Sequence, residues 1–475
     1  MSDDTGVPAR PPRPVRGDEI EVTVDDLAFG GQGVARAAGF VVFTPDTAPG
    51  DRVRVRLRKV RRRFGEADLL EVLEPGPGRV PVPCPFVPAC GGCRLQHVAY
   101  EEVLEAKRQQ VIEHLARLGG LTGIHVHEAD PALEHFGYRN KMEYSASPGP
   151  CGELVLGFHR RGRWDEVVDI NPCMLATADG NAAREAVRAW AVECGISPYD
   201  QRAQEGLLRH VVVREGVLTG QLLITIVTAS GADELVDQLA DCLPAALPSL
   251  VGIVHAINDG LSETTQGLPF RTVWGRDWIE EQVEVEPGNP VTLRLSAGSF
   301  FQTNSRMTGH LYRRVAEAAG LTGGEVLYDL FSGVGSIGVA LGRLSKQVLA
   351  IEMVPEAVDD SRGNAERNGI TNHTAMAGDV RVVLRENRGQ LPEPDVAIVD
   401  PPRAGLSGGA CRRILELAPK TLVYVSCQPA TFADNAKRFV DGGYTLEWVR
   451  PVDMFPQTPH IEAVARFTRG DSRPT

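Results

Sequence analysis

The sequence has no long apolar segment. No run approaches the roughly 20 residues that a helix needs to cross a membrane, and the N-terminal stretch MSDDTGVPARPPRPVRG lacks the apolar core of a signal peptide. We therefore expect a cytoplasmic protein that makes no membrane contact. The chain also shows no convincing internal repeat. Its 475 residues, 43% of them hydrophobic, are enough for about three domains of ordinary size.

A disulfide framework is not indicated either. The nine cysteines are an odd number in a long chain without an export signal. This argues against disulfide bonds and favours metal ligands or a reactive thiol.

Basic residues are outnumbered by acidic ones, 50 to 62. The formal net charge is −12, which by itself argues against a polyanionic partner. The exception is DRVRVRLRKVRRR, residues 51–63, with eight Lys or Arg and one Asp. Its alternation with Val and Leu is typical of a strand and predicts one face that holds Arg52, Arg54, Arg56 and Arg58. A basic run is more often a solvated face or tail, but a face of this kind suits the phosphates of a nucleic acid and would not select a base.

The strand and helix patterns divide the chain into four parts. Residues 298–475 alternate strands with helices, which predicts an α/β fold with a doubly wound parallel sheet and a terminal hairpin. Hairpin strands with helices between them predict a mixed α+β domain before it. The predicted parts are a disordered tail over 1–15, a small basic β-barrel over 16–75, a central domain over 76–297, in which a helix over 100–120 could pack on the last domain, and the α/β domain over 298–475.

A glycine motif follows the first strand of the last domain. Gly333, Gly335 and Gly338 lie in DLFSGVGSIG, and Glu352 ends the next predicted strand. Such glycines let the backbone approach a nucleotide, and an acidic residue at this point accepts hydrogen bonds from ribose hydroxyls. NAD and S-adenosylmethionine would both use the arrangement. A third interpretation of the motif is purely structural: the glycine turn lets the helix pack on the sheet and binds no nucleotide.

Two further strings favour S-adenosylmethionine. They are SFFQTN (299–304) and DPPRAG (400–405), and with them nearly the whole chain resembles the RNA uracil-C5 methyltransferases. Members of that family that methylate large-subunit ribosomal RNA have an N-terminal TRAM barrel and a cysteine-ligated iron–sulfur cluster, which the tRNA enzymes usually lack. The resemblance implies a class I (Rossmann-like) methyltransferase domain and 23S ribosomal RNA as substrate. We expect a monomer without an obligate protein partner.

The resemblance also assigns the cofactor contacts. They fall in the strings FFQTN, DLFSGVGS, AIEMV, AGD and VDPPR. The residues are Gln302, Phe331, Ser336, Glu352, Asp379 and Asp400.

Methyl transfer to C5 of uracil needs a thiol and a base. C5 is a poor nucleophile until a thiolate adds to C6, and the C5 proton must leave before the thiol is eliminated. Cys427 in TLVYVSCQPAT matches the family string SCxPxT, so the resemblance makes it the nucleophile. Glu462 in DMFPQTPHIE would be the base, with Asp453 and His460 as supports. Without the motif, Cys427 would more often be a small buried hydrophobe.

The chain departs from the family at one point. The cysteine motif commonly continues with an Arg-Asp pair, where this chain has Asp434-Asn435. This puts a local charge pair or phosphate contact in doubt, but not the nucleophile.

Arg403 follows the two prolines of DPPRAG. RNA cytosine-C5 methyltransferases typically have a cysteine at this position, so Arg403 argues against that family. The other functions considered are a tRNA uridine-C5 methyltransferase, an NAD-linked oxidoreductase and an RNA-binding protein with an inactive catalytic domain.

Three cysteines form a close group. Cys84, Cys90 and Cys93 have the spacing C-x5-C-x2-C, and the resemblance adds Cys173 in NPCML as a fourth metal ligand. Four thiolates suit zinc or a [4Fe–4S] cluster, which spacing alone does not separate; the family favours the cluster. CGGC by itself would also suit a redox-active pair. The other cysteines are expected to be packing residues: Cys151, Cys194, Cys242 and Cys411.

One more family string lies in the central domain. YRNKMEY (138–144) would place Arg139, Asn140 and Lys141 near RNA phosphates or the target base. From the sequence alone, an exposed polar turn is nearly as good an interpretation.

Overall fold

The computed structural model describes residues 14–37, 39–265 and 267–470. The tail predicted for residues 1–15 therefore lies almost entirely outside the described residues. No helix in the described part of the chain is long and apolar enough to span a membrane. The chain divides into two compact units, one made of Met1–Pro88, Cys93–Gln110 and Gln457–Pro459, and the other of Ala89–Gly92, Val111–Pro456 and His460–Thr475.

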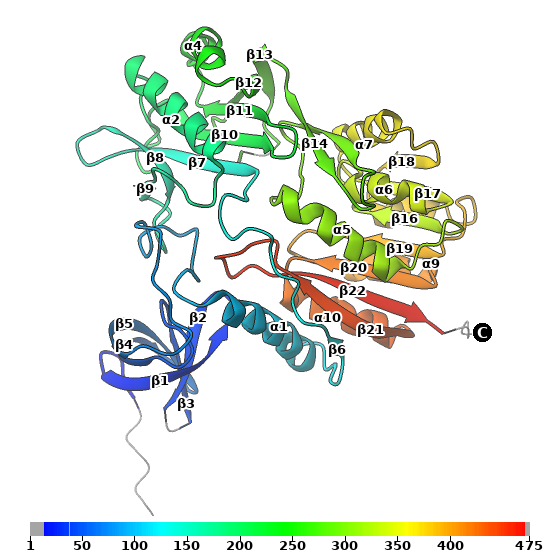
Figure 1. Ribbon diagram of the computed structural model, residues 1–475, viewed down its shortest axis with the longest axis horizontal. Coiled ribbons are helices and arrows are strands. Elements are labelled where there is room, and N and C mark those ends of the chain that lie inside the picture. The colour runs from blue at the N-terminus through cyan, green and yellow to red at the C-terminus, as the bar shows by residue number, and fades with distance from the viewer. Residues whose placement is uncertain (1–13, 38, 266, 471–475) are drawn as a thin grey trace, which may run out of the picture. The chain divides into compact units, whose positions relative to one another are not determined.

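A closed five-stranded barrel forms most of the first unit (blue in Figure 1). Its strands are joined in the order β1-β2-β3-β5-β4. Alternate apolar side chains fill the interior, and Val53, Val55 and Leu57 are at most 1% exposed. The small β-barrel predicted from the sequence is confirmed. The strands are β1 (Glu19–Ala28), β2 (Gln32–Ala37), β3 (Phe40–Thr44), β4 (Arg52–Val60) and β5 (Phe64–Glu74).

The arginines of β4 point outward on one face, as the alternation predicts, but their charge is largely compensated. The neighbouring strands β1 and β5 place acidic side chains alongside β4. Exposed ion pairs of this kind add little to stability, yet they remove most of the local positive charge suggested by the sequence. The pairs are Arg52 with Glu21 and Glu74, Arg54 with Glu71, Arg56 with Glu19, and Arg58 with Glu66 and Asp68.

A seven-stranded sheet forms the core of the central region in the second unit (cyan to green in Figure 1). Its order is β13-β12-β11-β10-β7-β8-β9, and all neighbours are antiparallel except β11 and β12. That pair is parallel because two helices connect its strands, a crossover that a hairpin turn does not allow. The elements are β7 (Lys141–Pro148), β8 (Leu154–His159), β9 (Val167–Asp169), α2 (Ala178–Glu193), β10 (Leu208–Gly216), β11 (Gln221–Thr228), α3 (Asp233–Asp237), α4 (Leu239–Ala246), β12 (Leu250–Ile257) and β13 (Phe270–Gly275). The helix predicted for residues 100–120 is α1 (Tyr100–Arg117), whose residues are divided between the two units.

The predicted doubly wound sheet is confirmed in the last part of the chain. Its order is β18-β17-β16-β19-β20-β22-β21-β6, and the first five strands are parallel. The terminal hairpin of β21 and β22 joins antiparallel to β20. The elements are β6 (His125–Val126), α5 (Ser305–Ala319), β16 (Val326–Leu330), α6 (Ser336–Leu341), β17 (Gln347–Glu352), α7 (Pro355–Arg367), β18 (His373–Ala377), α8 (Val380–Glu386), β19 (Val396–Val399), α9 (Gly408–Leu417), β20 (Thr421–Ser426), α10 (Pro429–Asp441), β21 (Tyr444–Val452) and β22 (Glu462–Arg469).

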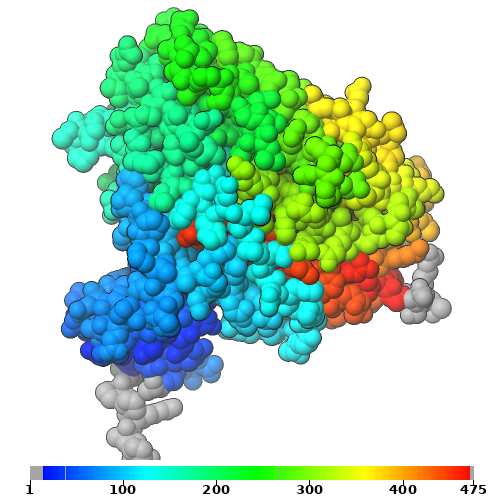
Figure 2. All heavy atoms as spheres, in the orientation of Figure 1, coloured from blue at the N-terminus to red at the C-terminus, as the bar shows by residue number. Residues whose placement is uncertain are grey.

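A two-stranded sheet of β14 (Trp278–Val283) and β15 (Val291–Ser296) joins the two sheets of the second unit. Glu281 on β14 is fully buried and accepts hydrogen bonds from the backbone N–H groups of Val217 (2.8 Å) and Leu218 (3.1 Å) after β10. On the other side, Asn364 of α7 accepts from the backbone of Arg294 (2.6 Å) on β15. In Figure 2 the green and yellow-green atoms of these regions form one continuous surface.

Asp130, in the segment after β6, is the centre of a buried charge cluster. Its carboxylate accepts hydrogen bonds from His310 Nε2 (2.9 Å), Arg314 Nε (2.6 Å) and Arg450 Nη1 (3.4 Å). Burial opposes the ionisation of Asp130, but the bonds from His310 and Arg314 outweigh it and lower its pKa from 3.8 to about 2. The fold therefore stabilises the ionised carboxylate, which links the β6 segment to α5 and β21.

We expect Asp130→Asn to lower the free energy of unfolding by about 2 kcal/mol at pH 7, since a pKa difference of nearly two units corresponds to about 2.5 kcal/mol. Because the folded pKa lies below the unfolded one, this stabilisation is present above about pH 4 and is lost as the pH falls toward 2. Urea unfolding at pH 7 and pH 3 measures the change. The control is Asp434→Asn, which removes only an exposed pair with Arg438. Equal destabilisation by Asp130→Asn at both pH values would contradict the expectation.

Candidate active site

The strand register of the eight-stranded sheet brings three of the predicted site residues to one edge. Asp400 and Cys427 are the first residues after the parallel strands β19 and β20. β22 runs antiparallel to β20 with Ser426 opposite Ala463, so Glu462, the first residue of β22, lies opposite Cys427. Asp400, Cys427 and Glu462 therefore meet at the carboxyl edge of the parallel strands, where doubly wound folds bind their ligands.

These three residues share an acidic and mostly buried environment. Glu462 is 2% exposed, and burial together with the nearby Asp400 raises its pKa well above 4.5. Burial and the charges of Glu462 and Asp400 raise the pKa of the Cys427 thiol to about 12. Arg403 lowers both pKa values. At neutral pH the thiol of the free protein is therefore protonated.

Asp400 is bonded to the loop that precedes α5. Gln302 is 5% exposed, and its Nε2 donates a hydrogen bond to Asp400 Oδ2 (3.3 Å). Burial and the charge of Asp329 raise the pKa of Asp400 to about 7, while the bond from Gln302 lowers it. Two residues taken from separate sequence strings, SFFQTN and DPPRAG, are thus in direct contact.

The loop between β16 and α6 turns sharply around Glu352. Phe331, at the start of the loop, has φ 65°, and Gly333 has φ 53°, both in the left-handed region that favours glycine. Glu352 Oε2 accepts a hydrogen bond from the backbone N–H of Gly333 (3.0 Å). This hydrogen bond holds the end of β17 and the glycine loop together.

Asp329, inside β16, is a carboxylate that the sequence reasoning missed. It is fully buried, and its Oδ2 accepts a hydrogen bond from the backbone N–H of Gly338 (2.8 Å). Burial raises its pKa to about 7. An acidic residue within the otherwise apolar strand VLYDL was the signal available in the sequence.

The remaining two residues predicted to contact the cofactor have partners within the protein. Ser336 Oγ lies 2.7 Å from Tyr312 Oη. Asp379 caps α8 by accepting from the backbone of Arg381 (2.8 Å), whose guanidinium also pairs with the carboxylate and lowers its pKa. Contact of Ser336 or Asp379 with a cofactor stays a prediction.

The YRNKMEY string is not an exposed turn. Tyr138 is 1% exposed and Asn140 is 4% exposed. Asn140 Nδ2 donates hydrogen bonds to the backbone carbonyl of Gln302 (2.8 Å) and to Ser305 Oγ (2.8 Å). Asn140 therefore fixes the loop that carries Gln302. Within the same string, Lys141 forms an ion pair with Glu143 (2.6 Å).

The departure at Asp434-Asn435 has a structural explanation. Asn435 is 2% exposed, and its Oδ1 accepts hydrogen bonds from the backbone of Leu406 (2.7 Å) and from Tyr424 Oη (2.9 Å). Its Nδ2 donates to the carbonyl of Leu406 (3.0 Å). A neutral amide at this position both donates and accepts, and so it ties the segment after DPPRAG to β20. Asp434 forms an exposed pair with Arg438.

Asp453 and His460 belong to residues 453–461, which connect β21 to β22. Asp453 is 2% exposed, and its Oδ1 accepts from the backbone of Phe455 (3.3 Å). The rings of Phe455 and His460 meet edge to face with centroids 5.8 Å apart. Support of Glu462 by either residue stays a prediction.

The four cysteines predicted as metal ligands are nearly buried, each with 8% or 9% of its surface exposed. Cys84 and Cys93 belong to the first unit, and Cys90 and Cys173 to the second. Within the described residues, no group of three or more His, Cys, Asp or Glu side chains is arranged to hold a metal ion. The chemistry of four protected thiols fits a thiolate-bound metal group, and their joint ligation stays a prediction.

The remaining cysteines differ from one another. Cys411 is buried and Cys194 is half-buried, in agreement with packing roles. Cys151, in the turn between β7 and β8, and Cys242, on α4, are exposed. The prediction that these two are packing residues was wrong, because turn and helix-surface positions face solvent whatever the residue type.

Comparison with known proteins gives matches along nearly the whole chain. The family model described as tRNA (Uracil-5-)-methyltransferase matches residues 217–469, and that of the TRAM domain matches residues 15–70. The chain is 35% identical over 450 residues to an uncharacterized RNA methyltransferase of Halalkalibacterium halodurans, covering 95% of this chain and 97% of that protein. It is 36% identical over 453 residues to one of Listeria monocytogenes, with 94% and 97% covered.

A solved structure is similar over the same extent. It is that of the Pyrococcus abyssi tRNA (uracil-54, C5)-methyltransferase in complex with S-adenosyl-L-homocysteine, with a TM-score of 0.74, 30% identity, and coverage of 94% of this chain and 100% of that chain. These matches leave no support for the NAD-linked oxidoreductase that the glycine motif alone allowed. The chain belongs to the RNA uracil-C5 methyltransferases, which methylate uridine in RNA with S-adenosylmethionine, and its barrel is a TRAM domain.

Proposed function

We propose that the chain methylates C5 of a uridine in 23S ribosomal RNA, with Cys427 as nucleophile and Glu462 as base. The observation that carries the chemistry is the position of these two residues opposite each other at the end of β20, with Asp400 beside them. The TRAM barrel and the four nearly buried cysteines support ribosomal RNA, since the family's ribosomal RNA enzymes combine these two features.

In the proposed reaction, the Cys427 thiol loses its proton to solvent, the thiolate adds to C6 of the uracil ring, and the electrons of the C5–C6 double bond move into an enolate. C5 of the enolate attacks the methyl group of S-adenosylmethionine, whose methyl–sulfur bond breaks to leave neutral S-adenosylhomocysteine. Glu462 then removes the C5 proton, and the double bond re-forms as the thiolate leaves C6. The base has to leave its stack in the RNA to reach this edge of the sheet.

Cys427 must lose its thiol proton before it can add to C6. With the pKa of its thiol at about 12, Cys427 carries a proton at pH 7, and burial beside Asp400 raises the pKa of Glu462 and so favours its neutral form. A nearby positive charge favours the ionised form of a thiol and of a carboxyl. Arg403 already acts in this direction, and the sulfonium of the cofactor would add to it. Cofactor binding is therefore expected to prepare the nucleophile and the base together.

The proposed cofactor site lies along the carboxyl edge of the parallel strands. Glu352 would bond the ribose hydroxyls, and Asp400 with Gln302 would lie next to the sulfonium. The residues that would hold the cofactor are Gln302, Phe331, Ser336, Glu352, Asp379 and Asp400.

The four cysteines Cys84, Cys90, Cys93 and Cys173 would hold a [4Fe–4S] cluster. A cluster with four protein thiolates has no open iron, so its role would be to crosslink distant parts of the sequence. The backbone N–H of Gly92 already points to Cys90 Sγ (3.4 Å), a contact typical of cluster-binding loops. No step of the methyl transfer depends on this group.

A tRNA uridine is the second candidate substrate. Two findings favour it, the match to the model described as tRNA (Uracil-5-)-methyltransferase and the likeness to the Pyrococcus abyssi tRNA enzyme.

The two substrates are separated by an assay of the purified full chain with methyl-labelled S-adenosylmethionine. We expect label in unmodified 23S ribosomal RNA transcripts, located at one or more 5-methyluridines, and none in tRNA transcripts. The Cys427→Ala variant gives the background. Label in tRNA alone would overturn the substrate assignment and keep the chemistry. Absence of label from both RNAs, with a folded protein that binds S-adenosylhomocysteine, would overturn the proposed function.

A further inference from the structure

The carboxyl of Glu462 depends on its backbone for its position. Burial and the charges of Asp400 and Arg403 act on this carboxyl, but no hydrogen bond to its oxygens is found among the described residues. A base that has to meet one proton of a bound uracil needs to be placed to within about 0.5 Å. What holds the backbone before Glu462 therefore bears directly on the proposed reaction.

That backbone is a buried connection. Residues 453–461 join β21 to β22 without regular structure, and Met454, Thr458 and Ile461 are at most 1% exposed. Connections usually run over the surface, because buried backbone N–H and C=O groups need hydrogen-bond partners. The partners of this connection accordingly determine where the chain enters β22 at Glu462.

The first part of the connection is bonded to two other segments. Asp453 donates its backbone N–H to the carbonyl of Asp130 (2.9 Å), in the segment after β6. Asn304, the N-cap residue of α5, donates from Nδ2 to the carbonyl of Met454 (3.3 Å). The connection is thus fixed where it leaves β21.

Tyr138 holds the middle of the connection. Its side chain is 1% exposed, and its Oη donates a hydrogen bond to the carbonyl of Pro456 (3.0 Å). Proline has no backbone N–H, so the carbonyl is the one group through which the backbone of Pro456 can be bonded. The hydroxyl of Tyr138 therefore sets the position of the chain at Pro456.

The chain turns at the next residue. Gln457 has φ 65°, in the left-handed region, and its carbonyl accepts hydrogen bonds from the backbone N–H groups of Arg94 (3.1 Å) and Leu95 (3.2 Å). These three residues belong to the first unit, and Tyr138 and Pro456 belong to the second. A non-glycine residue keeps such a φ only where its surroundings hold it. Two successive carbonyls, those of Pro456 and Gln457, thus fix the turn that leads to Glu462.

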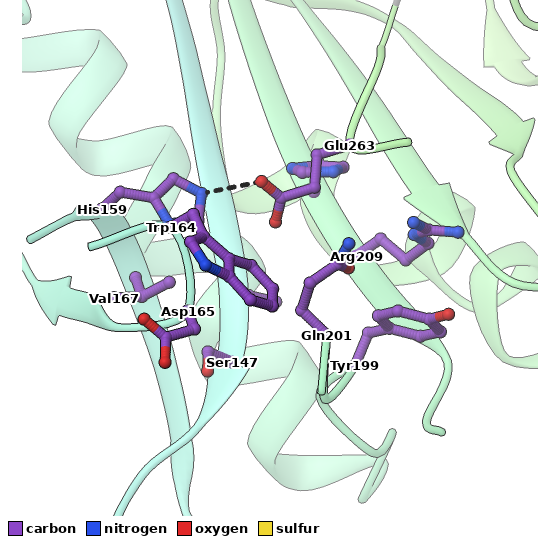
Figure 3. Close-up of a pocket in the computed structure, with 11 residues that line it drawn as sticks. Ser147, His159, Trp164, Asp165, Val167, Tyr199, Gln201, Arg209 and Glu263 are labelled. Atoms are coloured by element: carbon purple, nitrogen blue, oxygen red, sulfur yellow. Dashed lines mark ion pairs between the residues drawn. The ribbon is translucent and has the colours of Figure 1, made fainter. Parts of the chain in front are cut away.

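The segment that carries Tyr138 is itself fixed to the central region. The backbone N–H of Arg139 donates to the carbonyl of Leu175 (3.0 Å), and β7, which follows, pairs with both β8 and β10. On the face of the sheet shown in Figure 3, His159 of β8 forms an ion pair with Glu263 (3.2 Å) of the loop after β12. Tyr138 therefore extends from a well-supported part of the structure.

We propose that Tyr138 is a positioning residue for proton abstraction by Glu462. Its hydroxyl acts through the Pro456 carbonyl and the connection, not on the reacting atoms. In the step concerned, the C5 proton passes to the Glu462 carboxylate, the C5–C6 double bond re-forms, and the bond between C6 and the Cys427 sulfur breaks. Because Cys427 follows β20 and is not carried by the connection, methyl transfer does not depend on Tyr138. The inference rests on the proposed function, in which Glu462 is the base.

Tyr138→Phe tests this role because it removes the hydroxyl and keeps the ring. Single-turnover reactions of the full chain use RNA with tritium at C5 of uridine and S-adenosylmethionine with radiocarbon in its methyl group. Carbon label in RNA reports methyl transfer, and tritium in water reports proton abstraction. We expect methyl transfer at the rate of the unaltered chain and tritium release slowed about tenfold or more, since a displacement of 1 Å can cost about 100-fold in rate. A methyl-labelled protein–RNA adduct should accumulate transiently.

Tyr444→Phe is the matched control. Tyr444, the first residue of β21, is 3% exposed, and its Oη donates to the carbonyl of Pro419 (2.7 Å). This variant loses the same kind of hydrogen bond at the end of β21 away from the connection, and both labels should behave as in the unaltered chain. Pro456→Gly keeps the bonded carbonyl but removes the fixed φ of proline. It should also slow tritium release selectively, and it decides the question if Tyr138→Phe does not fold.

Three results would overturn the role of Tyr138. They are normal tritium release by folded Tyr138→Phe, equal slowing of both labels by that variant, and equally slow tritium release by Tyr444→Phe. Failure of the proposed function looks different. In that case Glu462→Gln would release tritium at the normal rate, or the unaltered chain would neither methylate nor release tritium from ribosomal RNA or tRNA.

Discussion

Glu462→Gln is expected to trap the enzyme on its RNA. Glutamine has nearly the same shape as glutamate but cannot take the C5 proton, so the reaction should stop after methyl transfer with Cys427 still bonded to C6. The product should be a protein–RNA adduct that survives denaturing gel electrophoresis and carries the methyl label of S-adenosylmethionine. Turnover should fall by at least about 100-fold, the usual contribution of a general base.

The Cys427→Ala variant should fail at an earlier step. Without the thiol no adduct forms and no methyl group is transferred, and the double variant with Glu462→Gln should give no adduct either. Cys411→Ala, which removes a buried cysteine of α9 that has no part in the proposed reaction, is the control and should methylate RNA. Normal turnover by Glu462→Gln, or an adduct that persists without Cys427, would contradict the assignment of base and nucleophile.

Protein purified without oxygen is expected to contain about four iron and four sulfide ions per chain, with the broad visible absorption of thiolate-to-iron charge transfer. Cys90→Ser should remove both the absorption and the iron, because it deletes one of four thiolate ligands. Cys151→Ser is the matched control, since Cys151 lies on an exposed turn in the same unit. One equivalent of zinc without sulfide would show that the four thiols hold zinc instead.

Two residues at the carboxyl edge of the parallel strands, Asp400 and Cys427, could be placed from the sequence because their positions follow from strand order. Asp400 and Cys427 come immediately after apolar strands, and parallel strands end on the same side of a sheet. The position of Glu462 was harder to foresee. Its position opposite Cys427 results from the antiparallel pairing of β22 with β20. The sequence motif does not indicate which residues of these two strands lie opposite each other.

Other features depend on partners that a local pattern does not contain. The arginine run of β4 predicted a basic face, but the acidic residues that compensate it come from β1 and β5, as far as 37 residues away in the chain. In the sequence Asn140 is only a polar residue. Its role is clear from the structure, in which its side chain donates a hydrogen bond to the loop that carries Gln302.

The buried acidic edge of the sheet also bears on how the enzyme exchanges its cofactor. Methyl transfer turns the cationic S-adenosylmethionine into neutral S-adenosylhomocysteine. The carboxyls of Asp329, Asp400 and Glu462 are not changed by the reaction, and they still favour a positively charged ligand. In the proposed site, the spent ligand therefore loses an electrostatic attraction that the fresh one has. Fresh S-adenosylmethionine should displace S-adenosylhomocysteine readily, and product inhibition should be weak for an enzyme of this kind.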